Sequence, residues 1–263
     1  MNNNKLCNSV SKTMNQLLDE IQRSIKTSVL DNSVGVAFSG GVDSTLVAKL
    51  LHDAGYDIQL LTIGFHDSHD INFAKEVNEF LKFKHNILEI EPESFQETSE
   101  KIHDIIKTDN LSWNENSIAF YYVSKLAKSL GISTVVTANG IDELFCGYNS
   151  YREAISISEN EVQKMMDLKL KNEKEMMIAV NNVSSEFGVT IVQPLLTDSF
   201  IDFAKTIPIS KKIHGADDLL RKHVIRELAI ECNVPKISAY KQKKALQYGT
   251  QIHKSLLKSR KTS

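Results

Sequence analysis

The sequence predicts an α/β fold in which a twisted parallel sheet has helices on both faces and a helical C-terminal lobe packs against it. Over roughly the first 150 residues, short runs rich in β-branched side chains alternate with stretches of helical spacing. Such alternation is typical of parallel strands joined by right-handed helical crossovers. Beyond residue 151 the pattern becomes mostly helical and charged. Because ligands of such folds bind beyond the carboxyl ends of the strands, the loops that follow the strands form the candidate site.

The individual elements follow from local patterns. Apolar residues at helical spacing predict an amphipathic helix over residues 12–30. Four strands are predicted next, at Val34–Phe38, Ile58–Ile63, His85–Ile90 and Thr134–Thr137. The helices between them are predicted at Asp43–Ala54, Ile71–Phe83, Pro92–Lys107 and Ser117–Leu130, the last capped by Gly131. The C-terminal lobe is predicted to contain helices at Glu159–Asn182, Asp198–Thr206 and Asp217–Cys232.

Length and composition limit the class of protein. A chain of 263 residues fits one large domain, with an α/β part over residues 1–150 and a helical part over residues 151–263. Its net charge of −2 and hydrophobic fraction of 41% are typical of a soluble globular protein. No apolar run approaches the ~20 residues of a transmembrane helix, and the polar N-terminus lacks the apolar core of a secretion signal, so we expect a cytoplasmic protein without membrane contact. The three cysteines are too far apart in sequence to indicate a zinc site or a disulfide framework.

A small-residue loop directly follows the first predicted strand. It reads Ser39-Gly40-Gly41-Val42-Asp43-Ser44 and runs into a predicted helix. Small residues let backbone N–H groups close around a phosphate, the helix N-terminus adds partial positive charge, and the serine hydroxyls donate further hydrogen bonds. Asp43 would then hold a cation beside that phosphate. The alternative is an ordinary strand-to-helix turn, in which glycine, serine and aspartate are common.

The fourth predicted strand leads into a second candidate segment, residues 137–148. It contains two adjacent carboxylates, Asp142 and Glu143. Carboxylates near a triphosphate repel it unless they coordinate Mg²⁺, a cation that carboxylate and phosphate oxygens share. The alternative is an acidic pair that only caps a helix beginning near Leu144.

Taken together, the two segments resemble those of a known family. Residues 39–44 resemble the pyrophosphate loop (PP-loop) of the ATP pyrophosphatase superfamily, whose fold is of the adenine nucleotide alpha hydrolase type. Residues 137–148 resemble a motif of asparagine synthetases and β-lactam synthetases, and the resemblance continues at residues 70–77, 193–198, 221–227 and 241–244. It implies that ATP is cleaved between its α and β phosphates, that a carboxylate is adenylated, and that an amine then displaces AMP.

This resemblance also implies roles for residues of the chain. Asp43 and Asp142 should bind the Mg²⁺ ions that bridge the phosphates of ATP, and Asp142, Glu143 and Lys243 should be the catalytic residues. Lys243 matches the family lysine that contacts the phosphates, although a shift of the alignment would put Lys241 or Lys244 there. The pyrophosphate end should be held by Ser39, Gly40, Gly41 and Ser44. The rest of the nucleotide should lie against Phe38, Ile63, Thr137, Ala138 and Gly140.

Three positions are the candidate contacts to the acceptor substrate. Asn139 stands where asparagine synthetases carry a glutamate and β-lactam synthetases a tyrosine, and an amide cannot act as a base, which leaves Glu143 or Tyr148 for that role. Glu115 stands where asparagine synthetases place an arginine near the aspartate carboxylates, which inverts the charge. Trp113 is expected either to pack on a larger or cationic acceptor or simply to pack in the core or at the lip of the site. Aspartate is the default substrate by resemblance, and these changes argue against it.

The sequence thus predicts an ATP- and Mg²⁺-dependent, AMP-forming amide ligase of the asparagine synthase type. Its expected partners are a small-molecule carboxylate and ammonia or another amine, supplied freely or by a separate glutaminase subunit, because residue 2 is Asn and not the cysteine of a glutaminase domain. A homo-oligomer is left open. The first alternative is a tRNA- or cofactor-modifying adenylase, for which the basic residues after Glu231 would meet RNA and Cys146 would carry sulfur. A solvated and partly disordered basic tail explains the lysines from Lys254 onward equally well. The second alternative is a nucleotide-binding subunit without catalysis.

Overall fold

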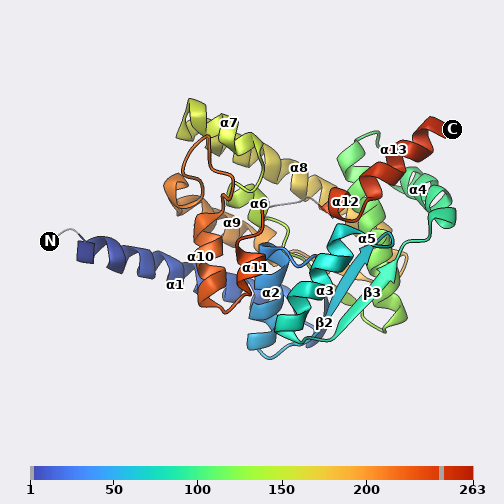
Figure 1. Ribbon diagram of the computed structural model, residues 1–263, viewed down its shortest axis with the longest axis horizontal. Helices are drawn as coiled ribbons and strands as arrows, with labels where there is room; N and C mark the ends of the chain where they lie inside the picture. Colours follow the sequence, from blue (N-terminus) through green and yellow to red (C-terminus); the bar gives the residue numbers. More distant parts are fainter. Residues whose placement is uncertain (1–2, 243–245, 263) are drawn as a thin grey trace.

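Five parallel strands form one sheet in the computed structural model, which describes residues 3–242 and 246–262 (Figure 1). The strands lie in the order β3-β2-β1-β4-β5. Their bounds are β1 Ser33–Ala37, β2 Asp57–Gly64, β3 His85–Glu89, β4 Thr134–Val136 and β5 Thr190–Val192. The central strand β1 pairs with β2 on one side and with β4 on the other, with Val36 opposite both Leu60 and Val136.

The four predicted strands are confirmed, each to within one residue at either end. The fifth strand is a correction to the sequence prediction. It has three residues and follows a long helix, which leaves too short a run for an alternating pattern to be recognised. Because Ile191 of β5 pairs opposite Val135 of β4, the sheet continues well beyond residue 150. Residues 151–263, expected to form a helical part, therefore also contribute one strand to the sheet.

The helices expected between the strands are present. They are α2 Val42–Asp53, α3 His69–Leu81, α4 Pro92–Ile106 and α5 Leu111–Ser129, and the sheet is preceded by α1 Asn3–Ser28. Helix α5 begins six residues earlier than predicted because the side chain of Asn110 caps it, accepting the backbone N–H of Trp113 at 3.3 Å. The later helices are α6 Ile141–Leu144, α7 Ser150–Ile157, α8 Glu159–Ser185, α9 Asp198–Thr206, α10 His223–Glu231, α11 Lys236–Ala239, α12 Leu246–Gly249 and α13 Ile252–Thr262, with 3₁₀ turns at η1 Pro194–Leu196 and η2 Ile209–Lys211.

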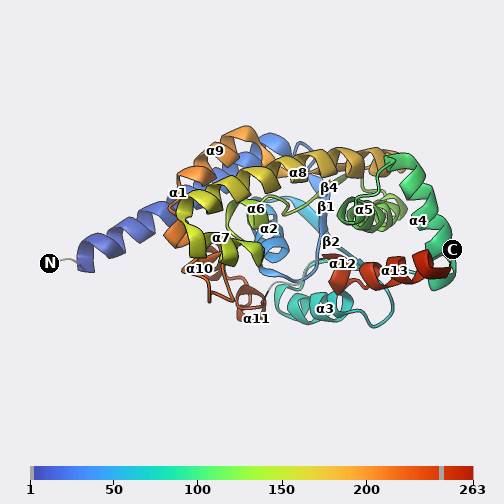
Figure 2. The ribbon, with the colours of Figure 1, turned by 90° about the horizontal axis from the view of Figure 1, so that it is seen from above.

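Alternate strand residues pack against two different sets of helices. Val36 and Leu60 belong to an apolar cluster with α1, α2, α9 and α10 on one face of the sheet. Leu61 and Ile63 belong to a second cluster with α4, α5 and α13 on the other face. Figure 2 shows α2 and α5 on opposite sides of the central strands. Helices on both faces, as predicted, follow from strands whose successive side chains are apolar in both directions.

Helix α8 joins the two faces. Its first half contributes Val162 and Met166 to the cluster that contains α2, and its second half contributes Met177 and Val180 to the cluster that contains α5. Figure 2 shows α8 passing across both sides of the sheet. The residues midway along α8 therefore lie between two apolar patches, over the loops that follow the strands, and can present polar side chains there.

The first part of the helix predicted at Asp217–Cys232 is a loop. Residues 217–222 are not helical, and α10 begins only at His223. The carboxylate of Asp218 accepts the backbone N–H groups of Leu220 at 3.1 Å and Arg221 at 2.9 Å, which competes with helical hydrogen bonding. Arg221 and Lys222 both have positive φ, at 51° and 54°. The chain thus turns sharply just before α10, and this turn places Lys222 in the site described below.

The C-terminal segment packs against the body of the molecule. Helices α12 and α13 contact α5, and Ile252 and Leu256 are buried in the same apolar cluster as that helix. The backbone N–H of Phe65 donates to the carbonyl of Thr250 at 3.1 Å. The segment from Lys254 onward is therefore not wholly solvated, because Leu256 is buried, although Lys254 and Lys258 are themselves exposed. Across the described residues, none of the helices combines the length and apolar character needed to cross a bilayer.

Candidate active site

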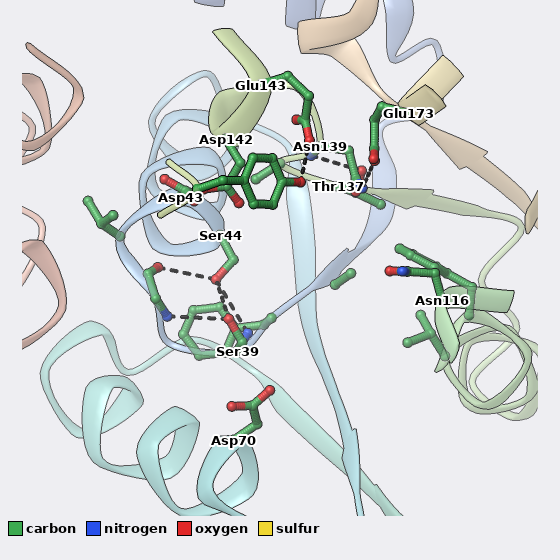
Figure 3. Close-up of a pocket in the computed structure, with 18 of the residues that line it drawn as sticks. Ser39, Asp43, Ser44, Asp70, Asn116, Thr137, Asn139, Asp142, Glu143 and Glu173 are labelled. Carbon is green, nitrogen blue, oxygen red and sulfur yellow. Dashed lines mark hydrogen bonds between the residues drawn. The ribbon is translucent and has the colours of Figure 1, made fainter. Parts of the chain in front are cut away.

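A cavity of about 330 Å³ opens at the carboxyl ends of β1, β2 and β4, the position expected for a ligand site in this fold. The loops after β1 and β4 form one side, and α5 and α8 form the other (Figure 3). Most of the residues singled out from the sequence meet here, since the lining includes Phe38, Ser39, Gly41, Asp43, Ser44, Ile63, Thr137, Ala138, Asn139, Asp142 and Glu143. The two candidate segments, about 100 residues apart in sequence, therefore belong to one site.

The loop after β1 is held by its own serine hydroxyls. Ser44 Oγ accepts the backbone N–H of Ser39 at 3.3 Å and donates to the carbonyl of Gly41 at 3.3 Å. Ser39 Oγ lies 3.4 Å from Ser44 Oγ and accepts the backbone N–H of Gly41 at 3.4 Å. Helix α2 begins at Val42, directly behind this loop. Hydroxyls, backbone N–H groups and a helix N-terminus at one place are the donors that bind phosphate oxygens.

The loop needs a glycine at position 40. Gly40 has φ of 75°, and a Cβ atom there would lie 3.1 Å from the carbonyl oxygen of Phe73 and 3.2 Å from the Cα of Ala74. Its carbonyl accepts a hydrogen bond from the buried hydroxyl of Ser238 at 2.7 Å. Gly40 does not line the cavity, so its role is to let the loop turn tightly against α3.

Two carboxylates, from the helices that follow β1 and β4, converge on one buried cation. The Nζ of Lys222 lies 2.5 Å from Oδ2 of Asp43 and 2.8 Å from Oδ1 of Asp142. The lysine side chain is only 2% exposed, and the carboxylates are about one-fifth exposed. Burial alone would lower the pKa of Lys222, but the negative charges of Asp142 and Asp43 outweigh it and hold the pKa above its usual value. Lys222 was not singled out from the sequence, because its loop read as part of a helix.

This carboxylate pair fits the donor set of Mg²⁺. Magnesium binds through one or two carboxylates and through the phosphates of its substrate. Asp43 lies in the first turn of α2, beside the phosphate-binding loop, and Asp142 lies in the first turn of α6. Both already share one positive charge in the structure, so their oxygens converge on a position suited to a cation. The predicted metal-binding residues are therefore together, and they are the residues that would hold Mg²⁺.

The loop after β4 is organised by Glu143. One oxygen of Glu143 accepts the backbone N–H of Gly140 at 3.1 Å, and the other accepts the hydroxyl of Tyr148. Gly140 has φ of 104°, and a Cβ atom there would lie 2.6 Å from the carbonyl oxygen of Leu195. Glu143 is 2% exposed. These contacts give Glu143 a positioning role, because its carboxylate is used to close the turn that carries Asp142.

Tyr148 is not suited to act as a base. Burial, and then the negative charges of Glu143 and Asp142, raise the pKa of Tyr148 well above its usual value. The hydroxyl thus keeps its proton and donates a hydrogen bond to Glu143. The Nζ of Lys169, from α8, lies 4.5 Å from the centre of the Tyr148 ring. Of the two candidate bases named from the sequence, both are therefore engaged in holding the loop.

A carboxylate that the sequence did not single out lies next to Asn139. The Nδ2 of Asn139 donates to Oε1 of Glu173 at 2.6 Å (Figure 3). Glu173 comes from the middle of α8, is 5% exposed, and lines the same cavity. The local sequence does not distinguish Glu173 from the many other charged residues of α8. The one available signal was its place on the buried face of that helix, among apolar residues. The loop after β4 thus carries an amide at Asn139, and α8 supplies a carboxylate, Glu173, next to it.

The expected acceptor contacts on α5 are corrected by the structure. Ser112, Asn116, Phe120 and Val123 line the cavity, whereas Glu115 and Trp113 do not. Since successive residues of a helix are 100° apart, Glu115 and Trp113 point away when Ser112 and Asn116 point in. Glu115 is 2% exposed, and its Oε1 lies 2.5 Å from Nδ1 of His253 in α13.

Trp113 does not line the cavity but contacts a residue that does. Its Nε1 donates to Oδ1 of Asn172 at 3.0 Å, and Asn172 lines the cavity. The ring packs against the apolar cluster on the α5 face of the sheet. The structure supports the second of the two sequence interpretations, simple packing, because Trp113 is partly buried at the edge of this cluster.

The expected adenine side lies at the ends of β1 and β2. The carbonyl of Phe38 accepts the hydroxyl of Thr62 at 2.7 Å, and its ring meets that of His85 edge-on at 5.7 Å. The hydroxyl of Thr62 also lies 2.8 Å from Nε2 of His85. Burial and then the charge of Lys75 lower the pKa of His85 to about 4, so the imidazole behind this wall is neutral at pH 7.

The lysine expected at the phosphates is described only in part. Lys243 and Lys244 lie outside the described residues. Lys241, one of the two alternatives under a shifted alignment, lines the cavity, and its Nζ lies 4.3 Å from the centre of the Phe73 ring. The buried guanidinium of Arg226 holds this segment by donating to the carbonyls of Ala239 at 2.5 Å and Lys241 at 3.1 Å.

Cys146 does not fit the role of a sulfur carrier. It is fully buried, with 0% of its surface exposed. Burial raises the pKa of its thiol to about 12, so the nucleophilic thiolate is absent at neutral pH. The structure thus gives no support to the sulfur-transfer version of the adenylase alternative.

The fold and the site together define an ATP pyrophosphatase domain of the asparagine synthase type. The family model for asparagine synthase matches residues 16–179, which include both candidate segments. The chain belongs to the asparagine synthase family. The resemblance stated from the motifs is therefore confirmed.

Curated relatives cover almost the whole chain. Asparagine synthetase (glutamine-hydrolyzing) 1 of Arabidopsis thaliana is 29% identical over 242 residues, covering 86% of this chain and 41% of the relative. Asparagine synthetase B (glutamine-hydrolyzing) of Escherichia coli is 27% identical over 256 residues, covering 89% of this chain and 45% of the relative. The chain thus spans less than half the length of either relative.

Among solved structures, an NMN synthetase from Francisella tularensis matches 91% of this chain and 77% of its own, with a TM-score of 0.48 and 16% identity. An NH₃-dependent NAD synthetase from Campylobacter jejuni matches 77% of this chain with a TM-score of 0.36 and 20% identity, covering 93% of its own chain. Likeness at this level says nothing about what this chain binds or converts.

Proposed function

We propose that this protein is an AMP-forming carbon–nitrogen ligase that adenylates a substrate carboxylate with ATP and then transfers nitrogen to the acyl group. One observation carries the proposal. Asp43 and Asp142, from the loops after two neighbouring strands, converge on a single cation position beside a phosphate-binding loop. The same cavity also contains a second polar region, formed by the amide of Asn139 and the carboxylate of Glu173.

The nucleotide end would bind and orient the triphosphate. Ser39, Ser44 and the N-terminus of α2 supply the hydrogen-bond donors for its pyrophosphate end. Asp43 and Asp142 would hold Mg²⁺, which neutralises negative charge on the phosphate oxygens when bound. Lys222 and Lys241 add positive charge at the same end, which favours departure of pyrophosphate once the carboxylate oxygen attacks the α-phosphorus.

The acceptor end would handle the incoming nitrogen. An amine that attacks an acyl carbon must lose a proton, and a carboxylate in hydrogen-bonding reach can take it. Glu173 is placed for this role, and the Nδ2 of Asn139 holds its Oε1 at 2.6 Å. The acid that asparagine synthetases carry in the loop is here supplied from α8. The nitrogen would come from ammonia or an amine, supplied freely or by a separate glutaminase.

The acyl substrate would be a small carboxylate whose far end forms hydrogen bonds. The lining of the cavity there includes the amides of Asn116 and Asn172, the hydroxyl of Ser112 and, from α8, the cation of Lys169. Aspartate remains the default candidate. With Glu115 turned away toward α13, its negative charge does not face an α-carboxylate, so the sequence-based objection to aspartate loses its main ground.

The test is acid-dependent exchange of labelled pyrophosphate into ATP, measured over a panel of small carboxylic acids beginning with aspartate. We expect exchange that needs both Mg²⁺ and one class of acid, and AMP as the nucleotide product when ammonia is added. Cleavage of ATP to ADP would refute adenylation. So would the absence of pyrophosphate exchange with every acid of the panel. Replacing ammonia by glutamine, with and without an added glutaminase, identifies the nitrogen source.

A matched pair of variants tests the acceptor end. Glu173→Gln should retain pyrophosphate exchange and slow amide formation by about 10²- to 10⁴-fold, the usual contribution of a general base. Glu175→Gln, on the exposed side of the same helix, should change neither. Equal loss of exchange and amide formation in Glu173→Gln would show that Glu173 does not act in the second step.

A further inference from the structure

A compact group of two histidines and one aspartate lies in the loop that leads into α10, outside the cavity described above. His214, Asp218 and His223 each present a ligand atom, and these atoms all lie within 4.8 Å of one another. The Nε2 of His223 is 2.6 Å from Oδ2 of Asp218. The rings of His214 and His223 are parallel, with centres 3.6 Å apart. Residues nine positions apart in sequence are thus brought to one point.

The aspartate of this group is held in place by the backbone. Its Oδ2 accepts the N–H of His214 at 3.0 Å, and its Oδ1 accepts the N–H groups of Leu220 and Arg221 at 3.1 and 2.9 Å. Such outer hydrogen bonds fix the orientation of a ligating side chain. The exposure is graded, with Asp218 and His223 partly buried and His214 exposed. The group is therefore fixed at its base and open to solvent on one side.

We propose that His214, Asp218 and His223 bind one transition-metal ion of the Zn²⁺ class, separate from the Mg²⁺ position at Asp43 and Asp142. Two imidazoles and one carboxylate are donors that suit Zn²⁺, Co²⁺ or Ni²⁺, whereas Mg²⁺ prefers oxygen ligands alone. Three protein ligands leave a fourth position for water. The ion would replace the hydrogen bond between His223 and Asp218, and the exposed ring of His214 would rotate out of its stack on His223 to bind it, because the nitrogen lone pairs of stacked rings lie in separate parallel planes.

The position of this site connects it to the nucleotide end of the cavity. Arg221 follows Asp218 by three residues and donates from Nε and Nη2 to the carbonyl of Gly147 at 3.3 and 3.2 Å. Lys222 is the next residue and bridges Asp43 and Asp142. A metal that ties His214 to the start of α10 therefore holds the turn that presents Lys222. The inference stands on this geometry and does not depend on the proposed ligase activity.

Metal binding by the untagged protein tests the proposal. Dialysis against Zn²⁺ in the presence of millimolar Mg²⁺, followed by metal analysis, should find one Zn²⁺ per chain. Zn²⁺ should also raise the Tm of the protein, and Mg²⁺ alone should not produce the same increase. Co²⁺ should give visible absorption bands of a four-coordinate site with nitrogen and oxygen ligands.

Variants locate the ion. His214→Ala and His223→Gln should each weaken Zn²⁺ binding by more than about tenfold, since even partners outside the ligand shell are worth about 10- to 100-fold. His66→Ala, which removes another exposed histidine with carboxylate neighbours, should bind Zn²⁺ like the parent chain. Because His214 is exposed, its replacement leaves the fold intact, which a thermal melt without metal verifies. No bound Zn²⁺, full displacement by Mg²⁺, or unchanged binding in His214→Ala would overturn the proposal.

Discussion

Replacing Lys222 by methionine removes a positive charge that contacts both Asp43 and Asp142. The two carboxylate oxygens both contact Nζ, so they lie no more than about 5 Å apart. At that separation two negative charges repel by about 3 kcal/mol with an effective dielectric constant of ~20. Breaking a buried ion pair by removing one partner costs about 3–5 kcal/mol in general, which agrees with this figure.

We expect the free energy of unfolding of Lys222→Met to fall by about 3 kcal/mol, which corresponds to a Tm lower by about 6–12 °C for a chain of this size. Mg²⁺ at millimolar concentration should recover part of the loss, because a bound cation restores the missing positive charge between the carboxylates. The assay is thermal and urea unfolding at pH 7, with and without Mg²⁺.

Lys212→Met is the matched control. Lys212 is also fully buried, but its Nζ donates to the carbonyl of Ala204 at 2.8 Å, and burial lowers its pKa to about 8. Its replacement should be neutral or stabilising, with no dependence on Mg²⁺. A Lys222→Met protein as stable as the parent chain, or an equal Mg²⁺ effect on both variants, would refute the reasoning.

Three further predictions test other parts of the structure. Gly40→Ala should weaken binding of Mg²⁺-ATP by more than Gly55→Ala, measured by calorimetry, because both glycines have positive φ but only at Gly40 does a Cβ meet neighbouring atoms. The free energy of unfolding should fall between pH 6.5 and 4 by about 1–2 kcal/mol less in His85→Gln than in the parent chain, after allowance for solvent screening. In this pH range the imidazole of His85 binds a proton in the unfolded chain but not in the folded one. Glu115→Ala should speed proteolysis of α13 by freeing His253, yet leave KM for the acyl substrate unchanged; a raised KM would return Glu115 to the substrate site.

The parts of the site that were predicted correctly are those with a local signal. The loop at residues 39–44 is recognisable because a phosphate cradle needs small residues between a strand and a helix, all within a few positions. The pairing of Asp43 with Asp142 was implied by the family resemblance, and the structure brings the two carboxylates together because the carboxyl ends of parallel strands meet at one edge of the sheet. The error at Glu115 has a simple cause. The segment was correct, but the helix phase was not known, and a shift of one residue on a helix turns a side chain by 100° from the cavity toward α13.

The sequence by itself determined the class of fold, the phosphate loop and the carboxylates beside it, because strand periodicity and turn chemistry depend on neighbours in the chain. Only the tertiary structure decided what completes these groups. It placed Glu173 of α8 against Asn139, it folded a predicted helix into the turn that inserts Lys222 between two carboxylates, and it brought His214 to His223. Each of these contacts joins elements whose separation in sequence carries no pattern, and each depends on how helices pack across the ends of the strands.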